Sequence, residues 1–213
     1  MKNIFKTIAV LLIFVFLTGC HKITTEGVTE ITYYPQFEMT GGKCVFHPIN
    51  TTFTEPGIKA FEGEKELTVS IKGTVDTSVK GLYFITYSAK NSDGFSASVQ
   101  RVVAVITAPK PSVDLSGEYV NVANTAKNSV ITKIDDILGY YHATDSWRQS
   151  RLIPLDFVDM GDGSIQIIPG SSPYGHFVGI GGEIIPPNRI RFNCMIDQGI
   201  NEGVKWNETY QLK

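Results

Sequence analysis

The 213-residue sequence is poor in the residues that build most catalytic and metal sites. It contains three cysteines, four histidines and two tryptophans. No Cys-x-x-Cys or closely spaced histidine pair occurs, so a structural zinc site has no support. No Gly-x-Ser-x-Gly stretch marks a hydrolase nucleophile. We therefore expect a protein that is not an enzyme and that needs neither a metal nor a cofactor.

An excess of basic residues is also missing, since 19 lysines and arginines stand against 21 acidic residues. Nucleic-acid binding depends on neutralising phosphates with Lys and Arg, so nucleic acid is not an expected partner. Long helical periodicity is absent beyond the first twenty residues. Tyr, Phe, Thr, Val and Ile are frequent and turn residues recur at close intervals, which predicts an all-β protein.

One long apolar run, from Ile8 to Leu17, follows the positive charges of Lys2 and Lys6. Its ten residues are too few for a membrane-spanning helix, which needs about 20, but they suit a secretory signal. The run ends in Leu-Thr-Gly-Cys20, which resembles the lipobox of bacterial lipoproteins. That resemblance implies a signal peptide over residues 1–19, an acylated Cys20 and a tether over residues 20–27.

The lipid anchor makes the membrane the first expected partner. Each buried methylene contributes about 0.8 kcal/mol, so several acyl chains, as lipoproteins of this class carry, hold a protein durably. His21 follows the cysteine where enteric bacteria place an aspartate to retain lipoproteins at the inner membrane. We therefore expect an outer-membrane protein, and the sequence leaves open whether it faces the periplasm or the cell surface.

Two β domains are predicted on either side of a proline-marked linker over residues 108–114. Pro109 and Pro111 cannot donate ladder hydrogen bonds and hold the chain extended. The domains then cover residues 28–107 and 115–213. Cys44 and Cys194 fall in different domains, so free, partly buried thiols are favoured over a disulfide.

The first domain shows a period-two pattern over residues 81–89, which leads through an Asn-Ser-Asp-Gly94 turn into a return strand over residues 95–106. This predicts a β-hairpin. The order of turns and strands resembles the immunoglobulin-like modules of bacterial cell-surface proteins. The residues that carry the resemblance are Glu55-Pro-Gly57 with Ala60, Gly73-Thr-Val-Asp76, Gly81-x-Tyr83, Tyr87-x-Ala89, Gly94 and Arg101-x-Val103. The resemblance implies a β-sandwich of about seven strands, with Tyr83 as its corner tyrosine.

The second domain reads as a series of short strands, including a hairpin around residues 159–163, and predicts a small antiparallel barrel or a second sandwich. Its layout, from a Gly-x-Tyr119 opening strand to a Trp206-x-x-Thr-Tyr-x-Leu closing strand, resembles the lipocalin-like C-terminal domains of Bacteroides lipoproteins. The whole chain resembles lipoproteins of Sus-like glycan-utilisation systems, which implies a glycan ligand.

Two stretches predicted as loops, residues 139–151 and 170–177, combine aromatic rings with polar groups. Sugars present apolar ring faces edged with hydroxyls, and aromatic side chains offer contact area at low entropic cost. The candidate ligand-binding residues are Tyr140, Tyr141, His142, Asp145, Trp147, Arg148, Tyr174 and His176. The alternative places Tyr140 and Trp147 in the core and leaves the rest as a solvated loop.

Two functions follow from these patterns. The first is a membrane-anchored, non-catalytic glycan-binding accessory protein, with the immunoglobulin-like domain as its spacer. The alternative is a structural or adhesion lipoprotein that binds a partner protein, such as another outer-membrane protein, through sheet edges or loops.

Overall fold

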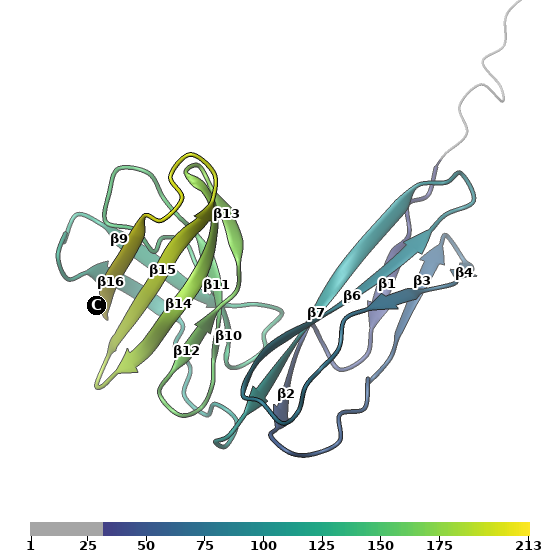
Figure 1. Cartoon of the computed structure of the whole chain (residues 1–213), viewed down its shortest axis with the longest axis horizontal. Helices are drawn as coiled ribbons and strands as arrows, with labels where there is room; N and C mark the ends of the chain where they lie inside the picture. The colour runs from purple at the N-terminus through teal and green to yellow at the C-terminus, as the bar shows by residue number, and fades with distance from the viewer. Residues whose placement is uncertain (1–31) are drawn as a thin grey trace, which may run out of the picture. The chain divides into compact units, whose positions relative to one another are not determined.

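The computed structural model describes residues 32–213, of which 34–213 form one compact unit (Figure 1). The predicted signal peptide, Cys20, the tether and residues 28–31 lie outside the described residues. Every regular element of the described part is a strand, and none of its segments is a helix suited to crossing a membrane. The prediction of an all-β fold is therefore confirmed.

Seven strands within residues 32–106 form a sandwich of two sheets, called the sandwich below. The strands are β1 (Gln36–Met39), β2 (Cys44–Pro48), β3 (Ile58–Glu62), β4 (Lys65–Leu67), β5 (Ser70–Lys72), β6 (Gly81–Lys90) and β7 (Ser96–Ile106). One sheet has the order β1-β3-β4 and the other β2-β7-β6-β5, with β2 running parallel to β7. The predicted hairpin is β6 and β7, and Gly94, with φ +92°, donates to the Asn91 carbonyl across its turn.

The sandwich core holds a fully buried arginine among apolar residues. Arg101 Nε lies 3.0 Å from Glu55 Oε1 and 3.2 Å from the Tyr87 hydroxyl, and the two terminal nitrogens donate to the carbonyls of Gly42 and Gly57. The Tyr83 hydroxyl donates to the Val79 carbonyl at 2.9 Å, which is the bond of a corner tyrosine. The role that the resemblance gave to Tyr83 is thus confirmed.

Nine strands after the sandwich form a single curled sheet, called the barrel below. They are β8 (Gly117–Asn121), β9 (Asn128–Lys133), β10 (Tyr140–Ala143), β11 (Leu155–Asp159), β12 (Ile165–Ile167), β13 (Gly170–Ser172), β14 (Gly175–Ile185), β15 (Arg189–Gln198) and β16 (Lys205–Leu212). Their order is β12-β11-β10-β9-β8-β16-β15-β14-β13, and neighbouring strands are antiparallel. The hairpin predicted around residues 159–163 joins β11 to β12.

Glycines let the two ends of the curled sheet meet. Ser164 bridges to Glu183, and β12 lies against β14 where a Cβ on Gly179 would stand 2.6 Å from Ile167 and one on Gly182 only 2.4 Å from Ile165. The pairing of β14 with β15 also shifts register between Gly179 and Gly181. Glycine is therefore required here for close approach and for a bulge.

Two strands of the barrel were missed by the sequence prediction. Residues 139–151 were expected to be a loop, but β10 occupies the first part of that stretch, and β13 lies within the second expected loop. Cys44 and Cys194 are free, as predicted, but they are buried and not partly buried, and burial raises the pKa of each thiol to about 12. Residues 107–116, which include the predicted linker, contain no strand. The domain boundary itself stays a prediction.

Candidate functional site

An aromatic pocket opens at the end of the barrel where β14 begins and β15 ends. Its volume is about 190 Å³, and its lining residues are Trp147, Ile153, Tyr174, Ile196, Asn201, Val204 and Trp206. The Trp147 and Trp206 rings meet edge to face with centroids 5.1 Å apart, and the Tyr174 ring lies 6.1 Å from Trp147. Both tryptophans of the chain therefore line one small cavity.

A closed turn holds Trp147 at the pocket. Asp145 Oδ1 accepts from the backbone nitrogens of Trp147, at 3.0 Å, and Ile153, at 3.1 Å. The Ser146 hydroxyl donates to the Ile153 carbonyl at 2.9 Å, and Ser146 N donates to the same carbonyl. Asp and Ser favour such local bonds to the backbone, which explains why the sequence breaks its strand pattern here.

A polar cluster lies inside the barrel beside the aromatic pocket. Its members are all at most 5% exposed, and they are Asn121, Ser129, Asp145, Glu208 and Tyr210. Asn121 Nδ2 donates to Glu208 Oε2 at 2.9 Å, and Arg148 Nε lies 3.2 Å from Glu208 Oε1. Ser129 Oγ accepts from Asp145 N at 3.2 Å. The polar cluster and the pocket share the turn of residues 145–153.

Four buried polar atoms at this end have no hydrogen-bond partner. They are Asp145 Oδ2, Trp147 Nε1, Trp206 Nε1 and the Tyr210 hydroxyl oxygen. A buried polar group left unpaired costs about 1–3 kcal/mol, so such groups call for an explanation. Burial raises the pKa of Asp145, although hydrogen bonds from Ile153 and Trp147 oppose the rise. Burial raises the pKa of Tyr210, the charges of Asp145 and Glu208 raise it further, and the Asn121 side chain lowers it.

The structure brings together four of the predicted ligand-binding residues. Trp147 and Tyr174 line the aromatic pocket, Asp145 holds its turn, and Arg148 closes over Glu208 of the polar cluster. Arg151, which the sequence did not single out, places its guanidinium carbon 6.0 Å over the Tyr174 ring.

The other four predicted residues do not reach the pocket. Tyr141 is a core residue whose hydroxyl accepts from Leu115 N and donates to the Val113 carbonyl, and Tyr140 is buried in a different apolar cluster. Tyr140 and Tyr141 are thus packing residues of a strand, which corrects their expected place in an aromatic platform. The half-exposed His142 and His176 each bond a neighbouring carboxylate through Nδ1: Asp156 at 2.7 Å and Asp197 at 2.6 Å.

Trp206, Tyr210 and Glu208 were not predicted as site residues. Their alternation along β16 places all three inside the barrel, since Trp206, Glu208 and Tyr210 are buried and the residues between them are less so. A carboxylate at an inward position between two aromatic residues is the signal that could have found them.

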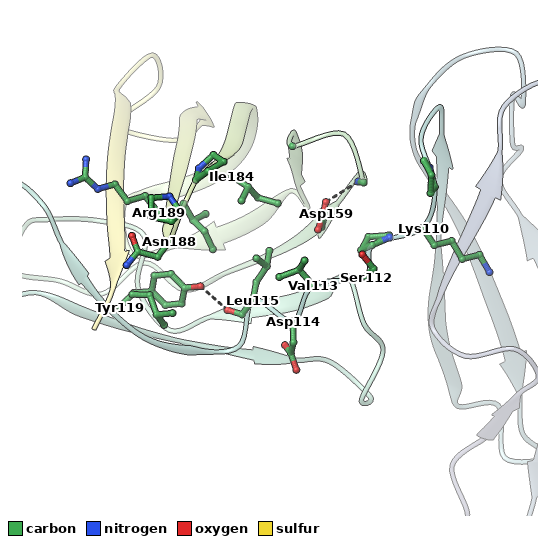
Figure 2. A pocket seen from close by; sticks show the side chains of 18 residues that line it. Lys110, Ser112, Val113, Asp114, Leu115, Tyr119, Asp159, Ile184, Asn188 and Arg189 are labelled. Carbon is green, nitrogen blue, oxygen red and sulfur yellow. Dashed lines mark hydrogen bonds between the residues drawn. The ribbon is translucent and has the colours of Figure 1, made fainter.

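A larger cavity of about 560 Å³ lies at the opposite end of the barrel (Figure 2). Its two buried polar side chains already have partners: the Tyr119 hydroxyl donates to the Leu115 carbonyl at 2.9 Å, and Asp159 Oδ1 accepts from Gly161 N at 2.8 Å. Within residues 32–213, none of the unpartnered buried atoms belongs to this cavity. The two ends of the barrel therefore differ in chemistry, and the smaller one carries the unmet hydrogen bonds.

Fold and site together define an all-β protein in which an immunoglobulin-like sandwich precedes a curled barrel. Residues 37–105 match the family described as bacterial surface protein, Ig-like domain, which confirms the predicted immunoglobulin-like character of this part of the chain. A comparison with curated proteins finds no match.

Two solved structures show similarity along most of the chain. A lipoprotein from Bacteroides thetaiotaomicron is 19% identical with a TM-score of 0.37, and the alignment covers 84% of this chain and 100% of that one. A Clostridium perfringens structure of CBM51-2 in complex with GlcNAc and INT domains is 13% identical with a TM-score of 0.31. That alignment covers 84% of this chain but 43% of the other, so this chain spans less than half of it.

Proposed function

We propose that this protein is a lipid-anchored, non-catalytic glycan-binding accessory protein of the bacterial envelope. The aromatic pocket is its binding site, and the sandwich is the spacer between anchor and site. The observation that carries the proposal is the grouping of Trp147, Trp206 and Tyr174 around one cavity, directly beside unpartnered buried polar atoms.

The chemistry of the pocket suits a sugar ring. Aromatic rings pack against the apolar faces of sugars, and polar groups at the edge of a pocket fix orientation. The volume of about 190 Å³ lies below the roughly 300 Å³ at which drug-sized sites begin. We therefore propose that the pocket takes a single sugar unit, at a chain end or a branch, and not an extended chain.

The envelope location rests on two features of the sequence. The lipobox-like ending at Cys20 supplies the anchor, and the family matched by residues 37–105 is one of bacterial surface proteins. Placement at the outer membrane, with the cell surface or the periplasm as the exposed side, is part of the proposal.

Tryptophan fluorescence tests the proposal directly, because the two tryptophans of the chain both line the pocket. We expect a panel of soluble glycans to shift the emission of the purified full-length protein, and Trp147→Ala with Tyr174→Ala to weaken binding at least tenfold. Phe95→Ala, which removes an exposed ring of the sandwich, is the control and should bind as the wild type does. Unchanged affinity in the double variant would remove the pocket from the proposal.

The seam between β12 and β14, which the bridge between Ser164 and Glu183 closes at one point, favours a second function, the binding of a partner protein. A groove of about 450 Å³ runs there between residues 164–167 and 179–182, and Ile180 is 44% exposed. Strand edges that are not fully paired can accept a strand from another chain. A photo-crosslinker at Ile180 should then capture one defined envelope protein that a crosslinker at exposed Val79 does not. If neither position gives a product, this alternative fails.

A further inference from the structure

The unmet hydrogen bonds of the barrel are concentrated at one end. Of the five buried side-chain atoms without a partner in residues 32–213, four belong to the turn of residues 145–147 and to β16, and the fifth is Glu55 Oε2 in the sandwich. Native proteins pair nearly all such groups with protein or ordered water. Four such atoms close together therefore call for an explanation, and two of them, the indole nitrogens, belong to residues that line the aromatic pocket.

The four atoms form a defined set of donors and acceptors. An ionised carboxylate such as Asp145 only accepts, an indole nitrogen only donates, and a tyrosine hydroxyl does both. The partner that fits such a mixed set both donates and accepts through small groups. Sugar hydroxyls do so. A carboxylate on the ligand would accept hydrogen bonds from the indole nitrogens, but it would not donate one to Asp145 and the two negative charges would repel each other.

The surrounding charges work against an acidic ligand. Asp145 and Glu208 both lie buried at this end, and Arg148 pairs with Glu208. The charge of Lys127 also acts on Asp145, but it comes from a half-exposed side chain whose Nζ donates to the Ser150 carbonyl. A third carboxylate placed near two others in a poorly solvated site is repelled. Arg151, whose guanidinium carbon lies 6.0 Å from the centroid of the Tyr174 ring, is the cation that an acidic sugar would use.

We propose that Asp145 is the residue that binds the ligand's hydroxyls, and that the aromatic pocket selects uncharged sugars over acidic ones. This inference rests on the proposed function and names the ligand class for the same site. Asp145 itself is fully buried, so the ligand reaches Oδ2 after a shift of the partly exposed Trp147 or through one bridging water.

The test compares Asp145→Asn with a matched control, Asp159→Asn. The first keeps an oxygen for the bonds from Trp147 N and Ile153 N and turns the unpartnered acceptor into a donor. The second alters an aspartate that is 5% exposed, that also accepts from a backbone nitrogen and that lies at the other end of the barrel. Burial raises the pKa of both carboxyls, which makes the pair closely matched.

The probes are two pairs of methyl glycosides that differ in one group. Each pair, glucoside with glucuronide and galactoside with galacturonide, exchanges a hydroxymethyl for a carboxylate. Tryptophan emission of the full-length protein should show at least tenfold tighter binding of one uncharged member than of its acidic partner. Asp145→Asn should bind that uncharged sugar at least tenfold more weakly than the wild type does, and its affinities for the uncharged and the acidic sugar should differ less. Asp159→Asn should match the wild type in both affinities.

The outcomes separate this inference from the proposed function. If glycans bind at the pocket but the acidic member binds as well as the uncharged one, or Asp145→Asn binds unchanged, the inference is wrong and the function stands. If no glycan binds, both fail, and a buried water is what completes the four atoms. If Asp145→Asn does not fold, Tyr210→Phe replaces it as the variant in the binding measurements. The indole N–H resonances of Trp147 and Trp206 are then also recorded in the wild type with each sugar, and they decide between the same outcomes.

Discussion

The sandwich and the barrel bury ionisable groups in opposite ways. In the sandwich, Arg101 is fully buried and each of its three guanidinium nitrogens has a partner. In the barrel, Asp145 is as deeply buried, yet one carboxylate oxygen has none. The arginine holds Gly42, Gly57 and Tyr87 in place. Arg101 thus supports the fold through guanidinium contacts that are all made, although Glu55 Oε2 beside it is buried without a partner. The role that we propose for Asp145 uses the carboxylate oxygen that the fold leaves unpaired.

A tyrosine corner of the same kind occurs in both the sandwich and the barrel. Tyr83 and Tyr119 each follow a Gly-x-Tyr pattern, and each donates at 2.9 Å to the carbonyl four residues earlier. The chain therefore closes its hydrogen bonds wherever they only fix a corner. Against that background the four unpartnered atoms at one end of the barrel stand out by their grouping, since the sandwich has one such atom, Glu55 Oε2, within the described residues.

The largest effect on stability is expected from replacing Arg101, which removes all the hydrogen bonds of its guanidinium group. Arg101→Met should lower the free energy of unfolding by about 3 kcal/mol, because Glu55 loses its ion pair and two backbone carbonyls lose a donor. Urea denaturation followed by fluorescence and circular dichroism measures the loss. Adding Glu55→Gln should restore part of it, and a double variant no more stable than the single one would contradict the ion-pair explanation.

Replacing Asp145 should change stability in the opposite direction to replacing Arg101. Asp145→Asn should raise the free energy of unfolding by about 1 kcal/mol at neutral pH, because it removes a buried charge while it keeps the bonds to Trp147 N and Ile153 N. A residue that weakens the fold yet strengthens binding is typical of functional sites. Thermal melts of both proteins measure the difference, and a destabilised variant would count against an uncompensated charge.

The gain from Asp145→Asn should also depend on pH. Burial raises the folded-state pKa of Asp145 above its ordinary value of 3.8, so the cost of the buried charge is present in full above the folded pKa. As the pH falls through the folded pKa and below 3.8, the wild-type carboxyl protonates in both states and the cost disappears. Melting curves from pH 7 down to pH 3 should therefore converge for the two proteins, and a constant gap would argue against titration of Asp145.

Local signals in the sequence were enough for much of the fold. The Asn-Ser-Asp-Gly94 turn predicted the β6–β7 hairpin, and Tyr83 was assigned its corner role from the order of neighbouring motifs. Strand β10 was missed because Tyr140 and Tyr141 are both buried, so the two faces of the strand do not alternate in polarity. An apolar pair in a short polar stretch then looks like a loop with aromatic residues.

The site was only partly predictable because its halves lie far apart in the chain. Asp145, Trp147 and Arg148 stand close together in sequence and were recognised by their mixed chemistry. Glu208 bonds Asn121 across 87 positions, and nothing local in either segment indicates the pairing. Tertiary structure alone shows that β16 brings a second tryptophan and a tyrosine to the same end of the barrel.

The smallest effects, and the most exact comparison, come from the two tyrosine corners. Tyr119→Phe leaves the Leu115 carbonyl buried without a donor, whereas Tyr83→Phe leaves a Val79 carbonyl that water can reach. An orphaned buried acceptor costs more than a hydrated one, so we expect losses of about 1.5 and about 0.5 kcal/mol in the free energy of unfolding. Denaturant titration of both variants measures the difference. Equal losses would mean that burial of the acceptor does not decide the value of these bonds, which would also weaken the case that the unpartnered atoms near Asp145 require a ligand.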